Sequence, residues 1–449
     1  MCANLSTLPC PENTTAWSHR AKCDSMRPVM TRPLPGDIRA FVEREASAVA
    51  DWLFAFCAQE SKLGFEAATR AEVISAFQGL NLAIEEVPYP PDIDQNPHHV
   101  PVPDLDQYPD HVRANVLATR AGDGGGRSLI LQTHLDVVPE SEGQRYERIQ
   151  DPERGEVLYA RGSNDAKGQV AALLLVMRAL AHFDISLQGD LELQLVTEEE
   201  VGGNGALAFI HAGHRADGVV VMEPSLAQIH PANRGALWFQ IGIEGVSMHM
   251  GRMHEGVSAI DKGISLIASF KEYEKELVAM SKGYRGFERY DHPVQLNVGI
   301  FQGGHWPSAV AGEAVIEGGV GFLPNKAMDD VRADLERIVA THPDEWIRNH
   351  TTIQFNKLRN DSFEIPYDHP LPTTLHAAVH DAGLESEVFG WNVSCDARLY
   401  ARVGGLPVVV FGPGDLATAH GPHEHFAVAD MIDAACALTQ FVQQWCGVR

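Results

Sequence analysis

The chain has 449 residues, and at roughly 150 residues per domain this length suggests two or three domains. It carries 35 Lys and Arg against 60 Asp and Glu, a net charge of −25 with neutral His. Such an acidic surface repels nucleic-acid backbones and anionic lipid, and no apolar run reaches the roughly 18 residues of a membrane-spanning helix. The seven Cys lack paired CxxC spacing, and no apolar signal core is visible at the N-terminus. We therefore expect a cytoplasmic protein with reduced thiols and with neither nucleic-acid nor membrane partners.

In chain order, residues 1–35 mix Pro, Cys and polar residues, and we expect them to form a disordered extension. Apolar residues at helical spacing then predict a helix over 37–59. The Pro-rich segment 85–110 does not suit a central strand or helix, because proline lacks the backbone N–H that both require. Short apolar runs predict strands at 128–133, 191–196, 218–222 and 406–411.

A longer apolar run predicts a helix over 165–183, with Ser163, Asn164 and Asp165 forming its N-terminal cap. Helices that alternate with continuous apolar strands indicate an α/β fold, with a largely parallel mixed sheet between helices. We assign residues 36–231 and 361–449 to this discontinuous main domain.

The segment 232–360 has a different order of elements. ALWFQIGIEG predicts a strand, AIDKGISLIASFKEYEKELVAM a helix, and VQLNVGIF and EAVIEGGVGFL two strands. DDVRADLERIVATH then predicts a helix, and TTIQFNKL predicts a closing strand. This β-α-β-β-α-β order is typical of a ferredoxin-like domain, and we expect it to be inserted into the larger one.

Motifs with His, Asp and Glu follow the predicted strands of the main domain or precede its long helix. They are His134-Leu135-Asp136, Gly162-Ser163-Asn164-Asp165, Thr197-Glu198-Glu199-Glu200, Glu223-Pro224 and Ala419-His420-Gly421-Pro422-His423-Glu424. Because sites in α/β sheets form beyond the carboxyl ends of the strands, we expect these groups to meet in one crevice. Two imidazoles and three carboxylates suit two divalent ions such as Zn²⁺, Co²⁺ or Mn²⁺ better than a thiolate site does.

Each motif alone is weak, because the chain has 21 His and 60 acidic residues. A solvated acidic turn is the ordinary interpretation of three consecutive glutamates, and a single His or Glu-Pro is usually an ordinary loop residue. The joint placement of all the motifs at strand ends favours the metal site.

Seven longer stretches extend from about residue 128 to 430: THLDVVP, ARGSNDAKG, TEEEVGGNG, VMEPS, GVSMHMGRMHEGVSAI, SCDARLY and FGPGDLATAHGPHEH. Together and in this order they resemble the M20 metallopeptidase family. This is the group of acetylornithine deacetylase, succinyl-diaminopimelate desuccinylase, aminoacylase-1 and carboxypeptidase G2, and the resemblance is closest to the deacetylase-like branch.

The resemblance implies two bound metal ions, which we expect to be zinc, with cobalt or manganese as alternatives. His134 and Glu223 would bind one ion, Glu200 and His420 the other, and Asp165 would bridge both.

Two further residues of the same motifs would carry out or support the reaction. Asp136 would orient His134 and fix the tautomer of its ring. Glu199 would be the general base, taking a proton from the metal-bridging water and delivering it to the leaving amine.

By the same resemblance, the inserted domain would be a lid through which two subunits form a homodimer. His249 would reach the active site of the partner subunit and bind the acyl oxygen, and Asn297 would contact the substrate. Arg398 would bind a substrate carboxylate with its bidentate guanidinium. The chain departs from the family in Glu198, where the family has Asp, and in the lid, where EGGVGFLP lacks the usual arginine.

We therefore predict a metallohydrolase that cleaves a C–N bond, most readily the amide of an N-acyl amino acid or a related small carboxylate. Two alternatives use the same core, an aminohydrolase acting on an aromatic amine and a dipeptidase. A third alternative is a catalytically silent homologue that acts as a binding module. The presence of Glu199 and of all five ligand positions argues against the silent homologue.

Overall fold

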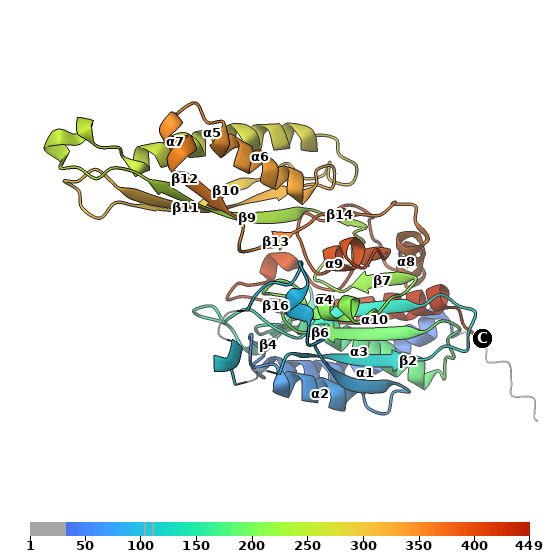
Figure 1. Ribbon diagram of the computed structural model, residues 1–449. Helices are drawn as coiled ribbons and strands as arrows, with labels where there is room; N and C mark the ends of the chain where they lie inside the picture. Colours follow the sequence, from blue (N-terminus) through green and yellow to red (C-terminus); the bar gives the residue numbers. More distant parts are fainter. Residues whose placement is uncertain (1–32, 103–104, 110–111) are drawn as a thin grey trace, which may run out of the picture. The chain divides into compact units, whose positions relative to one another are not determined.

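The computed structural model describes residues 33–102, 105–109 and 112–449 (Figure 1). The predicted disordered extension lies almost entirely outside the described residues. The α-helices are α1 (Pro35–Cys57), α2 (Ala67–Phe77), α3 (Lys167–His182), α4 (Asn204–His211), α5 (Ala259–Ser281), α6 (Met328–Ala340), α7 (Glu345–His350), α8 (Pro370–Asp381), α9 (Ala397–Arg402) and α10 (Val428–Cys446). In this part of the chain, no helix combines the length and the apolar character needed to cross a membrane.

The strands of the main domain are β1 (Ala83–Pro88), β2 (Ala114–Arg120), β3 (Leu129–His134), β4 (Glu147–Asp151), β5 (Gly155–Tyr159), β6 (Leu191–Val196), β7 (Gly218–Val221), β8 (Ala232–Asn233), β14 (Phe363–Glu364), β15 (Val408–Val410) and β16 (His425–Ala427). Six of them form one sheet in the order β1-β2-β6-β3-β7-β15. β6, β3, β7 and β15 are parallel, and β2 and β1 are antiparallel at one edge. The predicted α/β fold with a mostly parallel mixed sheet is confirmed.

Alternate residues of β3 enter different cores, because successive side chains of a strand point to opposite faces. Leu129 and Leu131 pack with α1, α3 and α10, whereas Ile130 packs with α4 and α9. All six residues of β3 are buried. Helices on both faces therefore fix the parallel strands, whose carboxyl ends lie along one edge of the sheet (Figure 1).

The N-terminal cap predicted for the long helix is wrong. α3 begins at Lys167, and its N-cap residue Ala166 makes no side-chain capping bond. The Asp165 carboxylate instead lies against His134 and His420, at 3.0 and 3.1 Å.

The segment predicted to be an inserted domain contains β9 (Gly235–Glu244), β10 (Leu296–Gly303), β11 (Glu313–Phe322), β12 (Thr351–Gln354) and β13 (Arg359–Asn360). These form an antiparallel sheet in the order β10-β11-β9-β12, with β13 also paired to β9. α5 and α6 share a separate apolar core with this sheet, which includes Phe239, Phe270 and Leu335. The β-α-β-β-α-β order agrees with the sequence, apart from the short α7 before β12.

Several elements were not predicted. β4, β5 and β16 form a small antiparallel sheet of their own. The Pro-rich segment contributes β1 and two short 3₁₀ helices, η1 (Ile93–Gln95) and η2 (Leu105–Gln107). β1 lies at the edge of the described sheet, paired with β2, and ends at Pro88, an edge position that tolerates a residue without a backbone N–H.

Candidate metal centre

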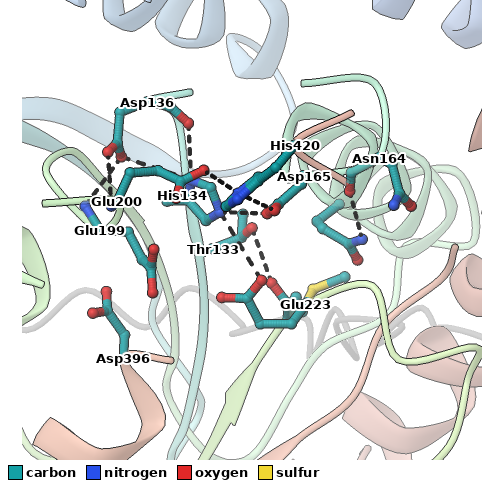
Figure 2. A network of polar contacts seen from close by, with 12 residues as sticks. Thr133, His134, Asp136, Asn164, Asp165, Glu199, Glu200, Glu223, Asp396 and His420 are labelled. Atoms are coloured by element: carbon teal, nitrogen blue, oxygen red, sulfur yellow. Dashed lines mark hydrogen bonds and ion pairs between the residues drawn. The ribbon is translucent and has the colours of Figure 1, made fainter. Parts of the chain in front are cut away.

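The five residues predicted as metal ligands lie together at the carboxyl edge of the parallel sheet (Figure 2). His134 is the last residue of β3, Glu200 follows β6, and Glu223 follows β7. Asp165 comes from the loop before α3, and His420 from the loop before β16. His134, Asp165 and Glu223 are buried, and Glu200 is half-buried. The His420 side chain is 52% exposed, which leaves one side of the cluster open.

Asp165 lies at the centre of the cluster, with one carboxylate oxygen facing each half. Its Oδ1 is 3.0 Å from Nε2 of His134, and its Oδ2 is 3.1 Å from Nε2 of His420. Glu223 Oε2 is 4.0 Å from the His134 nitrogen, and Glu200 Oε1 is 3.1 Å from the His420 nitrogen. The donor atoms thus form two groups that share Asp165.

This donor set fits two divalent ions. Each half offers one imidazole nitrogen, one glutamate oxygen and one oxygen of Asp165, which is three protein ligands per ion. Catalytic zinc sites have this number, because the fourth position is left for water or substrate. Donor atoms of His134, Asp165 and Glu200 lie within 4.8 Å of one another, close enough to surround a cation.

The charges of the cluster shift the pKa values of its members. Hydrogen bonds with Asp165 and Glu200 raise the pKa of His420 to about 10. Burial, opposed by the charge of His134 and reinforced by that of Asp165, raises the pKa of Glu223 well above its usual value. Burial likewise raises the pKa of Glu200. Carboxylates gathered this closely repel one another unless positive charge is supplied, and divalent cations would supply it.

Asp136 connects the two halves of the site through its backbone and its side chain. Its carbonyl oxygen is 2.9 Å from Nδ1 of His134, and its carboxylate lies farther from the same nitrogen, at 3.7 Å. The carboxylate instead accepts the backbone N–H groups of Glu199 and Glu200, at 3.2 and 3.1 Å. Asp136 therefore links β3 to the loop that carries the two glutamates.

Glu199 is half-buried beside the cluster, and its carboxylate makes no hydrogen bond or ion pair with any other described side chain. Burial, together with the charges of Asp396 and Glu223, raises its pKa well above the usual value. A carboxylate beside the metal ligands and free of other partners is able to exchange protons with a bound water.

Arg113 and Glu198 hold the same loop from the opposite side, a contact that the sequence analysis did not identify. Glu198 has φ 61, in the left-handed region, and its buried carboxylate receives Nε and Nη2 of Arg113 at 2.6 and 2.8 Å. Asn204 donates to the same carboxylate at 2.8 Å. Arg113 also donates to Asp94 of the Pro-rich segment at 3.1 Å and lies over the Tyr89 ring. The Pro-rich segment thus packs against the loop that carries Glu199 and Glu200.

Glu424 supports the loop that carries Asp165. Its buried carboxylate accepts the backbone N–H groups of Asn164 and Asp165, at 3.2 and 3.1 Å, and pairs with Arg161. Glu424 lies four residues after His420, within a stretch already matched to the family. Its position in that stretch was the sequence clue that Glu424 belongs to the site.

Arg398 is buried, and its guanidinium donates to the carbonyl oxygens of Cys395 and Gly202, at 3.0 and 2.9 Å. Gly202 belongs to the loop after β6, so Arg398 also fastens that loop. Its contact with a substrate carboxylate stays a prediction.

Asp396 is a buried carboxylate that faces Glu199 (Figure 2) and was not among the predicted site residues. Burial raises its pKa to about 6, and Gln132 donates to its Oδ2 at 3.1 Å. The sequence clue to Asp396 was its position two residues before Arg398, in the SCDARLY motif that resembles the family.

His249 and Asn297 are exposed and lie on the segment with the five-stranded sheet. Nδ1 of His249 accepts the backbone N–H of Gly251 at 3.1 Å. Among the described residues, no hydrogen bond or ion pair joins either side chain to the metal-ligand cluster. Their roles at the active site therefore stay predictions.

Comparisons with known proteins identify relatives of this chain. N-formyl-4-amino-5-aminomethyl-2-methylpyrimidine deformylase of Bacillus subtilis (strain 168) is 29% identical, over 71% of this chain and 79% of the relative. Acetylornithine deacetylase of Myxococcus xanthus is 27% identical, over 75% of this chain and 85% of the relative. A solved tripeptidase of Staphylococcus aureus has a TM-score of 0.68 at 17% identity, over 89% of this chain and 98% of that structure.

The family described as peptidase family M20/M25/M40 matches residues 130–444, which is more than half of the chain. The match confirms the family predicted from the motifs, and the solved structure confirms the fold. The chain belongs to peptidase family M20/M25/M40 and is a metal-dependent hydrolase of amide C–N bonds.

Proposed function

We propose that the protein removes a small acyl group from the nitrogen of a carboxylate-bearing substrate, at a site that holds two metal ions. The observation that carries the proposal is the Asp165 carboxylate, which lies between His134 and His420 and presents one oxygen to each. We expect zinc, with cobalt or manganese as alternatives. The names of the two relatives, a deformylase and a deacetylase, support a small acyl group.

Bound divalent ions would supply Lewis acidity, lowering the pKa of water and polarising the substrate carbonyl. Glu199 accepts a proton from the attacking water and later donates it to the departing nitrogen. Asp136 holds the backbone N–H groups of Glu199 and Glu200, so the base keeps its position beside the metal ligands. Arg113, through Glu198, holds the loop from its other side.

A substrate panel tests the proposal. The metal-loaded protein is incubated with N-formyl, N-acetyl and N-succinyl amino acids, with dipeptides, and with aminobenzoates. We expect one amine and one carboxylic acid to be released per turnover from an N-acyl compound, with kcat/KM at least about tenfold higher than for any dipeptide. A preference for dipeptides would support a dipeptidase, and ammonia released from an aminobenzoate would support an aminohydrolase. Either result would contradict the deacylase.

We further propose that the protein acts as a homodimer formed through the segment with the five-stranded sheet. Large apolar side chains are exposed on this segment: Val246, Met250, Met253, Ile264, Met280 and Trp306. Exposed large apolar side chains are often found where a protein surface binds another chain. In such a dimer, His249 would complete the site of the partner subunit, which is consistent with its exposure in the single chain.

Mixed dimers test this arrangement. Glu199→Ala and His249→Ala homodimers should both be nearly inactive. After random subunit exchange between them, about a quarter of wild-type activity should return, because half of the dimers are mixed and each has one complete site.

Exchange between wild-type subunits and Glu199→Ala/His249→Ala double-variant subunits is the matched control. About a quarter of the activity remains if His249 acts in the partner's site, and about a half remains if it acts in its own. The second value, or no recovery in the first mixture after demonstrated exchange, would contradict the proposal.

A further inference from the structure

A cavity of about 350 Å³ lies on the face of the five-stranded sheet that α5 and α6 leave open. Its walls include Trp238, whose side chain is 48% exposed, whereas the neighbouring Phe239 is buried in the core under the helices. Asn297 and Ile300 line the same cavity. No step of the mechanism above uses this space.

The pairing of the strands explains why the cavity exists. Gly319 on β11 pairs with Trp238 on β9 and with Asn297 on β10, so the three residues form one row across the sheet. Because Gly319 has no side chain, the indole of Trp238 is able to lean over it. A Cβ at Gly319 would lie 3.0 Å from Cδ1 of Trp238. Gly321, two residues along β11, lies under Arg234 in the same way, with Nη1 3.0 Å from the position of a Cβ.

The indole gives this wall of the cavity a flat apolar surface, because the Trp238 side chain is half exposed and lies over Gly319. An aromatic ring in the cavity is able to pack against this surface, an arrangement that aromatic pairs favour.

One end of the cavity carries an unneutralised positive charge. Arg234 lines the cavity and donates from Nη1 to Gln295, while its buried Nε has no hydrogen-bond partner. Among the described residues, no carboxylate forms an ion pair with Arg234, and burial lowers its pKa. At the other end, Glu317 is already paired with Lys357. The charge in the cavity that no described ion pair neutralises is therefore positive, although the net charge of the whole chain is −25.

We propose that this cavity is a binding site for a planar aromatic anion. The ring would pack against the indole of Trp238, and the anionic group would accept hydrogen bonds from Arg234 and Asn297. Charge-assisted bonds of this kind are stronger than neutral ones. The assignment of this group to the non-reacting part of the substrate rests on the proposed function and on the predicted contact of Asn297 with the substrate.

The test uses the full-length, metal-loaded protein labelled with 5-fluorotryptophan and observed by ¹⁹F NMR. The chain has seven Trp, and the resonance of Trp238 is assigned by its loss in Trp238→Phe. Benzenesulfonate is the probe, because a sulfonate is a weaker metal ligand than a carboxylate. We expect a saturable shift of the Trp238 resonance. Trp306, which is 66% exposed and outside the cavity, is the matched control and should not shift.

Two comparison compounds separate the contributions of shape and charge. Cyclohexanesulfonate keeps the charge without the flat ring and should bind about fivefold more weakly. Benzyl alcohol keeps the ring without the charge and should bind at least about tenfold more weakly. In Arg234→Gln, the difference between benzenesulfonate and benzyl alcohol should disappear.

Gly319→Val displaces the indole, because a Cβ there would lie 3.0 Å from Cδ1 of Trp238, and it should weaken benzenesulfonate binding by about tenfold or more. If the other Trp resonances keep their wild-type positions, this variant is folded. If they do not, Gly319→Ala replaces Gly319→Val in the test. The proposal is overturned if the Trp238 resonance does not shift, if Trp306 shifts equally, or if Gly319→Val binds as tightly as the wild type. Because NMR measures binding without turnover, inactivity on the N-acyl panel would overturn the proposed function and leave this result intact.

Discussion

Asp165→Asn is expected to abolish both metal binding and activity. The substitution preserves the size of the side chain but removes the negative charge and one of the two oxygens that face His134 and His420. Since both proposed ions share this residue, one ion loses its ligand oxygen and the other keeps only an uncharged one. We expect metal content below one ion per chain and a loss of kcat/KM of about 10³ or more. Atomic emission analysis of the protein and assay on the best N-acyl substrate measure the two effects.

Asp51→Asn is the matched control, since Asp51 is an exposed carboxylate on α1 that pairs with Arg148. It should keep both metal content and activity near the wild-type values. Full metal retention by Asp165→Asn would mean that Asp165 is not a shared ligand, and the proposal of two ions would then be wrong.

Glu199→Gln should have the opposite combination of properties, normal metal content with little activity. In the described part of the chain, no hydrogen bond or ion pair joins the Glu199 side chain to the ligands, and the backbone N–H that Asp136 accepts is unchanged by the substitution. An amide cannot take the proton from water, so kcat should fall by about 10²–10⁴ while the fold and metal content persist.

Metal analysis and the dependence of kcat/KM on pH provide the measurement. Glu199→Asp keeps a carboxylate farther from the cluster and should retain more activity than Glu199→Gln. Loss of metal in Glu199→Gln would make Glu199 a ligand, and near-wild-type turnover would exclude it as the general base.

The ligand cluster was predictable from the sequence because it follows from one rule of α/β folds. His134, Glu200 and Glu223 come directly after parallel strands, and the ends of parallel strands meet along one edge. The main sheet and the β-α-β-β-α-β order were predictable for a similar reason, since apolar periodicity is a local property of the chain.

The residues that hold the cluster in place were not predictable in the same way. Arg113 meets Glu198 across 85 positions of sequence, and Glu424 meets Asp165 across 259. Such pairs follow from the tertiary packing and have no local pattern. The error at the start of α3 has a related cause, because a capping preference is a local tendency and the two histidines that attract Asp165 are distant in sequence.

The two separate apolar cores have a consequence for how members of this family diverge. The core around α1, α3 and α10 supports the strands that end in the metal ligands, whereas Phe239, Phe270 and Leu335 belong to a core that the five-stranded sheet shares with α5 and α6. Positions on the open face of that sheet, such as Gly319 and Gly321, belong to neither core, so their substitution leaves both in place. Residues on this face are therefore able to change substrate specificity at little cost to the stability of the domain that holds the metal ligands. The residues that carry out the reaction stay the same while such changes accumulate.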